Sequence, residues 1–257
     1  APTGSGRAPV ARVHEVGAVT PPDGPADAGT VLLAGDSVAW SLLAGFDRWT
    51  ESHPDHTLQI DSLTSFGCPI GGRGRYRTVH ERYTLPDCAA FADTVTTDLA
   101  DHPPDAIVFV MGLGNLNGRE IDGVWRDLGD PVHDRWLEDR VDDLATRLEE
   151  AGVPVLWLTF PYVRLADPED PTRPWQEIPL NDPARVDRYN ALVNRVLAGH
   201  DGVEVVDLAG WVATWPNGSF DPADRDGVHF SFRASARVVE WLAPTILMHL
   251  GVEPPPP

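Results

Sequence analysis

Residues Val31–Ala39 read Val-Leu-Leu-Ala-Gly-Asp-Ser-Val-Ala, an apolar run that ends in a glycine and passes into a polar turn. The run predicts a short buried strand, and the pattern after Ser37 predicts a helix over about residues 38–48. Similar apolar runs occur at Leu58–Leu63, Ala106–Met111, Val155–Phe160 and Val203–Asp207. Each is followed by helical periodicity, at about residues 88–100, 134–151, 183–199 and 233–249. This alternation predicts an α/β fold, a three-layer α/β/α sandwich around a five-stranded parallel sheet.

The chain is long enough for one sizeable domain, and 42% of its 257 residues are hydrophobic, which is enough to form a core. Residues 1–29 are rich in Pro, Gly and Ala and have little periodic apolar pattern, so we expect an N-terminal arm. We place one domain at residues 30–250 and a proline-rich tail at 251–257.

The formal net charge is −19, from 39 acidic and 20 basic residues. All 20 of those basic residues are arginine, because the chain contains no lysine. The missing lysine excludes Schiff-base chemistry and a P-loop, which both need a primary amine. The negative charge argues against nucleic acid and anionic membrane surfaces as partners, since both require a basic protein face.

Two cysteines, Cys68 and Cys88, are the only thiols in the chain and are too few for a four-ligand cysteine zinc site. We interpret them as one disulfide, which implies an oxidising compartment. Spacing alone fits two unrelated buried thiols as well. No run reaches the ~18 apolar residues that a transmembrane helix needs. No signal peptide is visible, although Ala1 could follow a cleavage site.

Ser37 is predicted to lie at the turn between the first strand and its helix. Open α/β sheets bind ligands beyond the carboxyl ends of their strands, so a serine at this turn is well placed as a nucleophile. Gly35 permits a tight turn, and a helix N-terminus directs N–H groups toward a developing oxyanion. The alternative is that Ser37 only caps the helix, as serines often do.

Asp226 and His229 lie near the C-terminus, in the sequence Asp-Arg-Asp-Gly-Val-His-Phe of residues 224–230. A serine nucleophile needs a base, and the imidazole of that base needs an acceptor that fixes its tautomer and orientation. Gly227 permits a turn in which side chains three residues apart face each other. One loop would then supply both the orienting carboxylate and the general base. The alternative is a surface histidine beside an acidic cluster.

Gly35-Asp36-Ser37 and Asp226-Gly227-Val228-His229 resemble the first and last blocks of the SGNH (GDSL-like) hydrolase family. The resemblance covers about residues 30–250 in the order of elements. Residues 225–230, Arg-Asp-Gly-Val-His-Phe, resemble in particular the SGNH domains attached to family-three membrane acyltransferases, which act outside the cytoplasm on glycans or other hydroxylated acceptors. The resemblance implies a flavodoxin-like sheet, Ser37 as nucleophile, Asp226 as orienting carboxylate and His229 as base.

The resemblance also implies an oxyanion hole that includes the Ser37 N–H group. The family's second block is a glycine after the second strand, whose N–H joins this hole. Gly67 is our candidate, and Gly71 and Gly72 are less favoured. As an alternative, any of these glycines could serve only its turn.

The family's third block, Gly-x-Asn-Asp, fits the chain poorly. Counted from Gly112, its asparagine column falls on Gly114, and an asparagine follows one place later. Asn115 is therefore the candidate for the third oxyanion donor, with Asn117 or no side chain as the alternatives.

Three other ligand-binding patterns fail on residue type. The third glycine of a dinucleotide fingerprint would be Asn117. A calcium loop in the C-terminal acidic cluster would place Pro222 and Arg233 at ligand positions. His53 and His56 flank a proline and have no evident third ligand. We therefore expect neither a metal ion nor an organic cofactor.

Two tryptophans, Trp175 and Trp215, lie in proline-rich stretches that we expect to be loops. Aromatic rings at such places can stack on a sugar ring or an acyl chain, so both are candidate substrate-binding residues. The alternative is that each ring only holds its own loop in place.

These patterns predict a serine esterase or O-acyltransferase that forms an acyl-enzyme on Ser37. The ester-linked group would be acetyl or another short acyl group on a glycan or other hydroxylated substrate. The irregular third block motivates an alternative, a non-catalytic carbohydrate- or ligand-binding module on the same scaffold. We expect a monomer outside the cytoplasm, either secreted or as the outer domain of a membrane acyltransferase. Acyl length, acceptor identity and the choice between hydrolysis and transfer stay open.

Overall fold

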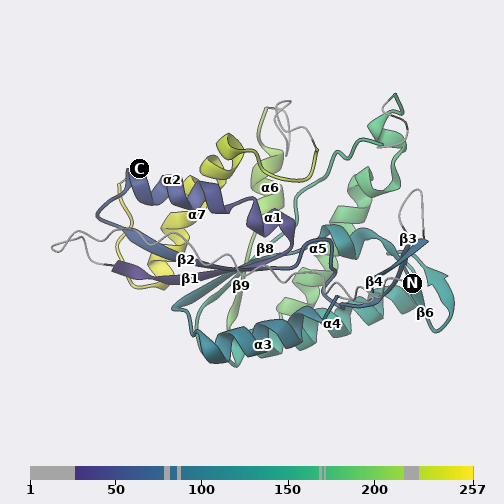
Figure 1. Ribbon diagram of the computed structural model, residues 1–257, viewed down its shortest axis with the longest axis horizontal. Coiled ribbons are helices and arrows are strands. Elements are labelled where there is room, and N and C mark those ends of the chain that lie inside the picture. The colour runs from purple at the N-terminus through teal and green to yellow at the C-terminus, as the bar shows by residue number, and fades with distance from the viewer. Residues whose placement is uncertain are drawn as a thin grey trace, which may run out of the picture.

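A computed structural model shows one central parallel sheet (Figure 1). Its strands are β1 (Asp27–Gly35), β2 (Thr57–Thr64), β5 (Ala106–Val110), β8 (Val155–Leu158) and β9 (Val203–Val206). They are hydrogen-bonded in the order β2-β1-β5-β8-β9, and each neighbouring pair is parallel. The structure describes residues 27–77, 82–85, 88–167, 170, 172–216 and 226–256. The predicted five-stranded α/β fold is confirmed.

Helices cover both faces of this sheet and make the three layers. One face carries α1 (Ser37–Trp40), α2 (Leu43–Ser52) and α7 (Phe232–His249), while α3 (Phe91–Asp101) and α4 (Pro131–Glu149) cover the other (Figure 1). α5 (Pro183–Leu197) packs beside α4, and the short α6 (Leu208–Ala213) follows β9. Both α4 and α5 begin at an Asp-Pro pair, in which the aspartate side chain caps the helix and the proline takes the first helical position.

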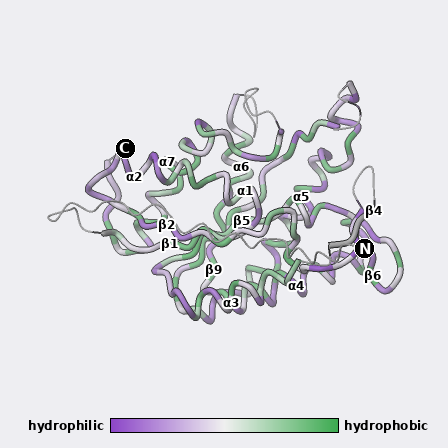
Figure 2. The backbone as a smooth tube through the Cα atoms, in the orientation of Figure 1, coloured by the Kyte–Doolittle hydropathy of each residue, from purple (hydrophilic) through white to green (hydrophobic). Residues whose placement is uncertain are grey.

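The central strands are apolar because helices bury them on both faces. Every residue of β5 and of β8 is buried, and hydrophobic colour is concentrated along the sheet strands in Figure 2. Large side chains such as Leu33, Phe109 and Trp157 fill the space between the layers. The carboxyl ends of β1, β2 and β5 meet at one edge, where the chain reverses from one side of β1 to the other. This is the place where open parallel sheets bind ligands.

A second, four-stranded antiparallel sheet was not predicted. Its order is β4 (Arg82–Leu85), β3 (Gly74–Arg77), β6 (Gly118–Ile121) and β7 (Val124–Arg126), and it lies at one end of the molecule (Figure 1). Arg119 is buried and connects this sheet to α4, because its guanidinium donates to the Arg73 carbonyl at 2.7 Å and lies 4.0 Å from the Trp136 ring centroid. Burial and the nearby charge of Arg140 lower the pKa of Arg119 to about 10.

The helix expected over residues 38–48 is divided into α1 and α2. The Ser41 hydroxyl donates to the Val38 carbonyl, and the Leu42 N–H donates to the Ala39 carbonyl. Such three-residue spacings tighten the turn and end α1 after four residues. The helix that follows Ser37 is therefore shorter than its sequence pattern predicts.

The first strand begins at Asp27, inside the segment expected to form an arm. The rest of that segment, residues 1–26, lies outside the described residues, so the domain boundaries stay a prediction. Among the helices that the structure describes, none has the length and hydropathy needed to cross a bilayer.

Candidate active site

Ser37 is the first residue of α1 and directly follows the carboxyl end of β1. The residue before it, Asp36, is buried, and its carboxylate accepts hydrogen bonds from the N–H groups of Val38 and Gly112, each at 2.9 Å. The Asp36 N–H in turn donates to the Val110 carbonyl at 3.2 Å. Asp36 therefore fixes the turn that carries Ser37 against the end of β5.

Gly35 allows β1 and β5 to approach each other at this turn. Its φ is +147°, and a Cβ atom there would stand 1.8 Å from the Val110 carbonyl oxygen. Only glycine fits such a position. Two residues after Gly35, the N–H of Ser37 has no hydrogen-bond acceptor among the residues that the structure describes.

Asp226 and His229 face each other across a turn, with Asp226 Oδ2 2.7 Å from His229 Nδ1. The other carboxylate oxygen accepts from the N–H groups of Val228 and His229, each at 2.9 Å. Partial burial alone would raise the pKa of Asp226, but the hydrogen bonds from His229 and Val228 lower it below its ordinary value. An ionised carboxylate thus holds the Nδ1 side of the imidazole.

The turn between Asp226 and His229 depends on Gly227 and on the chain that follows β8. Gly227 has a φ of +70°, and its carbonyl accepts a hydrogen bond from the Arg164 N–H at 2.8 Å. A Cβ atom on Gly227 would stand 1.9 Å from the Arg164 carbonyl oxygen. The histidine loop is therefore held against the segment after β8 by backbone contact.

Ser41 links the histidine loop to α1, the helix that begins at the candidate nucleophile, and the sequence reasoning missed this link. Its hydroxyl accepts a hydrogen bond from the Phe230 N–H at 3.1 Å and donates to the Val38 carbonyl at 2.7 Å. The linked residues are 189 positions apart. The only sequence signal for this link was a serine one helical turn after Ser37. The sequence does not show that Phe230 is its hydrogen-bond partner.

The Nε2 atom of His229 is buried and has no hydrogen-bond partner among the described residues, so it does not bond to the Ser37 hydroxyl in this structure. The loop that carries His229 is held beside α1 by the hydrogen bond from the Phe230 N–H to the Ser41 hydroxyl. Burial raises the pKa of Asp36, while hydrogen bonds from backbone N–H groups and the charge of His229 oppose that rise.

Gly67 lies in the loop after β2, the strand that neighbours β1 at the edge of the sheet. Its φ is +69° and it is exposed. No described residue accepts a hydrogen bond from its N–H. The next residue, Cys68, forms a disulfide with Cys88, with the two Cα atoms 5.7 Å apart. The predicted disulfide is thus present, and it braces the loop that carries Gly67.

Asn115 lies in a short 3-10 helix after β5, η1 (Leu113–Leu116), and is buried. Its side-chain oxygen accepts a hydrogen bond from the Ile70 N–H at 3.1 Å, which joins the third block to the loop after β2. Its amide nitrogen is buried with no partner among the described residues, and the Tyr189 hydroxyl lies nearby. Asn117 is also buried, at the end of η1.

A family model matches residues 8–244 of the chain, and its description is an SGNH domain fused to AT3 domains. The chain belongs to this SGNH family. No curated protein matches it as a relative. Membership supports a hydrolase or esterase, and it does not distinguish hydrolysis from acyl transfer.

Solved structures share the fold of this SGNH domain. An acetyl xylan esterase, AlAXEase, aligns with a TM-score of 0.56 at 12% identity, over 84% of this chain and 98% of that one. LAE5, an α/β hydrolase enzyme from the metagenome of Lake Arreo, Spain, aligns with a TM-score of 0.55 at 16% identity, over 89% of this chain and 98% of that one. A GDSL-like lipase from Bacteroides thetaiotaomicron aligns with a TM-score of 0.52 at 14% identity, over 86% of this chain and 88% of that one. At these identities the likeness shows the fold alone.

The two candidate substrate-binding tryptophans lie in different surroundings. Trp175 is partly exposed in a short 3-10 helix, η2 (Trp175–Glu177), and the Arg164 guanidinium lies over its ring at 4.8 Å. Trp215 follows α6 and is only 7% exposed, packed edge-on against Trp211 and beneath Arg237. Its burial gives no support to a stacking role, whereas the surface position of Trp175 leaves its ring accessible.

No group of three or more His, Cys, Asp or Glu side chains comes together as a metal site within the described part of the chain. The expectation of a metal-free and cofactor-free site stays a prediction. The chemistry available at this edge of the sheet is that of a hydroxyl, an imidazole, a carboxylate and backbone N–H groups.

Proposed function

We propose that this SGNH domain is a serine esterase or O-acyltransferase, with Ser37 as nucleophile, His229 as general base and Asp226 as the carboxylate that orients it. The observation that carries the proposal is the Asp226–His229 pair at 2.7 Å, tied to the nucleophile helix through Phe230 and Ser41. An imidazole fixed at Nδ1 by a carboxylate presents a basic Nε2.

The reaction needs only these groups. As the Ser37 oxygen forms a bond to the acyl carbon of an ester, His229 Nε2 takes the serine proton, and the electron pair of the carbonyl moves onto its oxygen. His229 then gives the proton to the leaving alcohol as the ester bond breaks. Water or a second alcohol attacks the acyl-enzyme, and the same proton transfers run in reverse. Catalytic hydrogen bonds commonly tighten only when substrate binds, so the free Nε2 does not oppose this scheme.

The test is hydrolysis of p-nitrophenyl acetate by the wild type and by Ser37→Ala, His229→Ala and Asp226→Ala. Activity is expected to fall by about 10⁶-fold for the first two, with a smaller loss of about 10⁴-fold for Asp226→Ala, because nucleophile and base act as a unit. Circular dichroism and thermal unfolding should match the wild type. Wild-type turnover by a folded Ser37→Ala protein would leave the non-catalytic binding module as the better account.

The proposed oxyanion hole consists of the N–H groups of Ser37 and Gly67 and the side-chain amide of Asn115. The first two lack acceptors among the described residues, and the Asn115 amide nitrogen is buried and unpaired within the same set. Burial without a partner costs free energy, which an oxyanion would repay during the reaction.

Asn115→Ala distinguishes two roles of this side chain, an oxyanion donor and a structural anchor for Ile70. Loss of a donor should cost about 2.7–4 kcal/mol in kcat with KM little changed. Loss of the bond to Ile70 should instead lower the melting temperature. A fall in kcat of less than about threefold, under 1 kcal/mol, would reduce Asn115 to an anchor and leave the hole to backbone N–H groups.

The finer assignments belong to the same proposal. The substrate is an acetyl or short acyl ester of a glycan or another hydroxylated molecule, supported by the acetyl xylan esterase among the fold relatives and by the family's fusion to AT3 domains. That fusion and the Cys68–Cys88 disulfide support a location outside the cytoplasm, joined to a membrane acyltransferase. Product analysis with an added alcohol acceptor distinguishes transfer from hydrolysis.

A further inference from the structure

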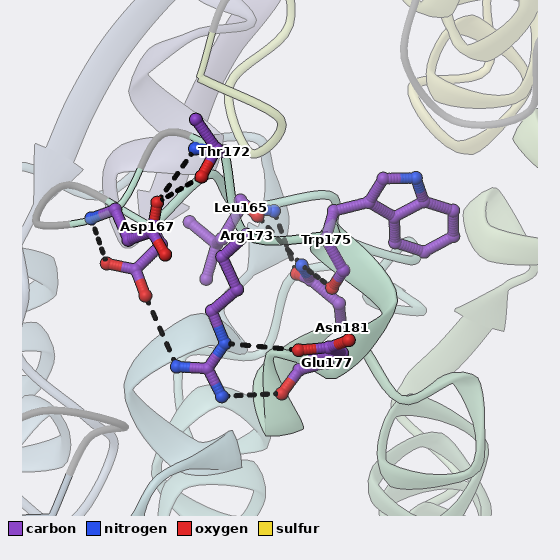
Figure 3. A network of polar contacts seen from close by, with 8 residues as sticks. Leu165, Asp167, Thr172, Arg173, Trp175, Glu177 and Asn181 are labelled. Atoms are coloured by element: carbon purple, nitrogen blue, oxygen red, sulfur yellow. Dashed lines mark hydrogen bonds and ion pairs between the residues drawn. The ribbon is translucent and has the colours of Figure 1, made fainter.

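The segment between β8 and α5 has little regular structure, yet buried polar groups hold it in place. The Asn181 side-chain amide donates to the carbonyls of Leu165 and Trp175, each at 2.8 Å, and its oxygen accepts from the Leu165 N–H. Asp167, also buried, accepts from Arg173 at 3.2 Å (Figure 3). A satisfied buried polar network rigidifies the backbone that carries it. Rigid support for an irregular surface segment is the arrangement that binding sites need.

Two residues of the same segment, Trp175 and Arg164, are partly or fully exposed beside this network. The Trp175 indole projects away from the hydrogen-bonded groups in Figure 3. The guanidinium of Arg164 lies over that ring at 4.8 Å, and Arg164 is exposed. Within the described residues no carboxylate pairs with Arg164. Among the residues that the structure describes, its N–H donors therefore have no carboxylate partner beside the aromatic ring.

The location of this pair assigns it to one half of the ester. The Arg164 backbone is bonded to Gly227, two residues before His229. In the proposed mechanism His229 Nε2 must give its proton to the oxygen of the leaving alcohol, so the alcohol half lies on the histidine side of Ser37. The Gly67 donor lies instead after β2, which is on the opposite side of β1 in the strand order from β8, the strand that precedes Arg164. The alcohol half is therefore the half that Arg164 and Trp175 can reach.

We propose that Arg164 and Trp175 form the binding subsite for a neutral sugar ring in the alcohol half of the substrate. A pyranose has apolar C–H faces and a rim of hydroxyl oxygens, which match an aromatic ring beside guanidinium donors. The net charge of −19 disfavours a polyanionic glycan, because the field of the whole protein repels it. This inference rests on the proposed function, and it adds the half of the ester that is recognised and the residues that recognise it.

The test compares two acetyl esters that differ in their alcohol half, glucose pentaacetate and p-nitrophenyl acetate. We expect Arg164→Ala to lower the ratio of their kcat/KM values by about tenfold or more, the effect typical of losing a charged hydrogen-bond donor to a bound oxygen. Trp175→Ala should lower the ratio by a smaller factor. Arg164→Lys, which keeps the charge and loses the planar fork, should give an intermediate ratio.

Arg75→Ala is the matched control. Arg75 also lies over a tryptophan, Trp125, at 5.3 Å, but in the small sheet away from Ser37, so its removal should leave the ratio unchanged. An unchanged ratio in Arg164→Ala, or an equal fall in Arg75→Ala, would overturn the inference. So would a wild type that hydrolyses p-nitrophenyl acetate through Ser37 but not glucose pentaacetate.

Failure of the proposed function itself would look different, because no ester would then be hydrolysed in a Ser37-dependent way. In that case binding of xylotriose to the Ser37→Ala protein, followed by tryptophan fluorescence, still tests the subsite. Binding that weakens at least about tenfold in Ser37→Ala, Arg164→Ala supports it. No binding, or equal binding by the two proteins, overturns it.

Discussion

The nucleophile turn and the histidine loop perform complementary parts of one proposed reaction but are held in different ways. The turn at Ser37 is fixed from inside, since Asp36 is 3% exposed and binds the backbone of both α1 and the loop after β5. The histidine loop is fixed at the surface, where the Asp226 side chain is 55% exposed. The polar centre of the first region is buried, whereas in the second the apolar side chains of Val228 and Phe230 are buried and the Asp226 and His229 side chains are partly exposed. Substitutions should therefore affect stability in one region and mainly activity in the other.

The sharpest contrast is between two glycines. Gly35→Ala would drive a Cβ atom into the Val110 carbonyl in the middle of the sheet, so we expect loss of more than about 4 kcal/mol of stability or no folded protein. Gly227→Ala would collide with the Arg164 carbonyl in a loop outside the sheet, and we expect a folded protein with a displaced His229 and little activity. Chemical unfolding measures the stability of the two variants, and ester hydrolysis measures their activity. Equal destabilisation by the two substitutions would remove the contrast.

Asp36 and Asp226 should show the same contrast, with the larger loss of stability on replacement of Asp36. Asp36→Ala leaves the buried N–H groups of Val38 and Gly112 unsatisfied, which should cost roughly 3 kcal/mol of stability together with activity. Asp226→Ala removes the acceptor of one exposed N–H group and one part-buried N–H group, so its unfolding free energy should change by less than that of Asp36→Ala while kcat falls. Denaturant midpoints and kcat values of the two variants and the wild type test this contrast. A stable, inactive Asp36→Ala protein would show that the nucleophile turn does not depend on this carboxylate.

The disulfide braces only the nucleophile side. Replacing Cys68 and Cys88 by serine opens a loop with a sequence separation of 20, which should cost about 3 kcal/mol by the chain-entropy model. Because Gly67 precedes Cys68, activity should fall further than stability alone explains. Reduction followed by activity and unfolding measurements checks this. Full activity in the reduced, folded protein would separate the Gly67 loop from the proposed oxyanion hole.

The smallest effect is expected away from both regions. Burial alone would lower the pKa of His200, but hydrogen bonds with Glu149 and Asp142 raise it above 6.5. The stabilisation from protonated His200 is therefore complete below pH 6.5 and is lost as pH rises through the raised pKa. Unfolding measured from pH 6 upward should show a decline that His200→Gln lacks, with ester hydrolysis unaltered. An identical pH profile in the variant would contradict this assignment.

Much of the candidate site could be read from sequence because its signals are local. Ser37 follows a strand pattern directly, and Asp226 lies three residues from His229, so a single turn places their side chains together. The disulfide needed no choice of partner, since the chain has two cysteines. The resemblance of the first and last blocks to one family then joined the two ends of the chain.

Other features were hidden because their signals are short or distant. The strands of the small sheet have three or four residues each, too few for an alternating pattern, and β3 pairs with β6 across more than 40 positions. The break between α1 and α2 follows from hydrogen bonds at Ser41 that no propensity predicts. Trp215 is in a stretch that reads as a loop, yet its ring is buried.

The sequence alone therefore determined the five strands of the parallel sheet and the main helices between them, the candidate nucleophile and the candidate Asp–His pair, because periodicity and short turns act over a few residues. Only the tertiary structure decided which atom of the Asn115 amide is hydrogen-bonded, which serine joins the two candidate catalytic segments and which tryptophan stays at the surface. Those outcomes depend on contacts between residues tens to hundreds of positions apart. Their free energies are set by burial and hydrogen-bond satisfaction in the assembled fold, which local sequence does not encode.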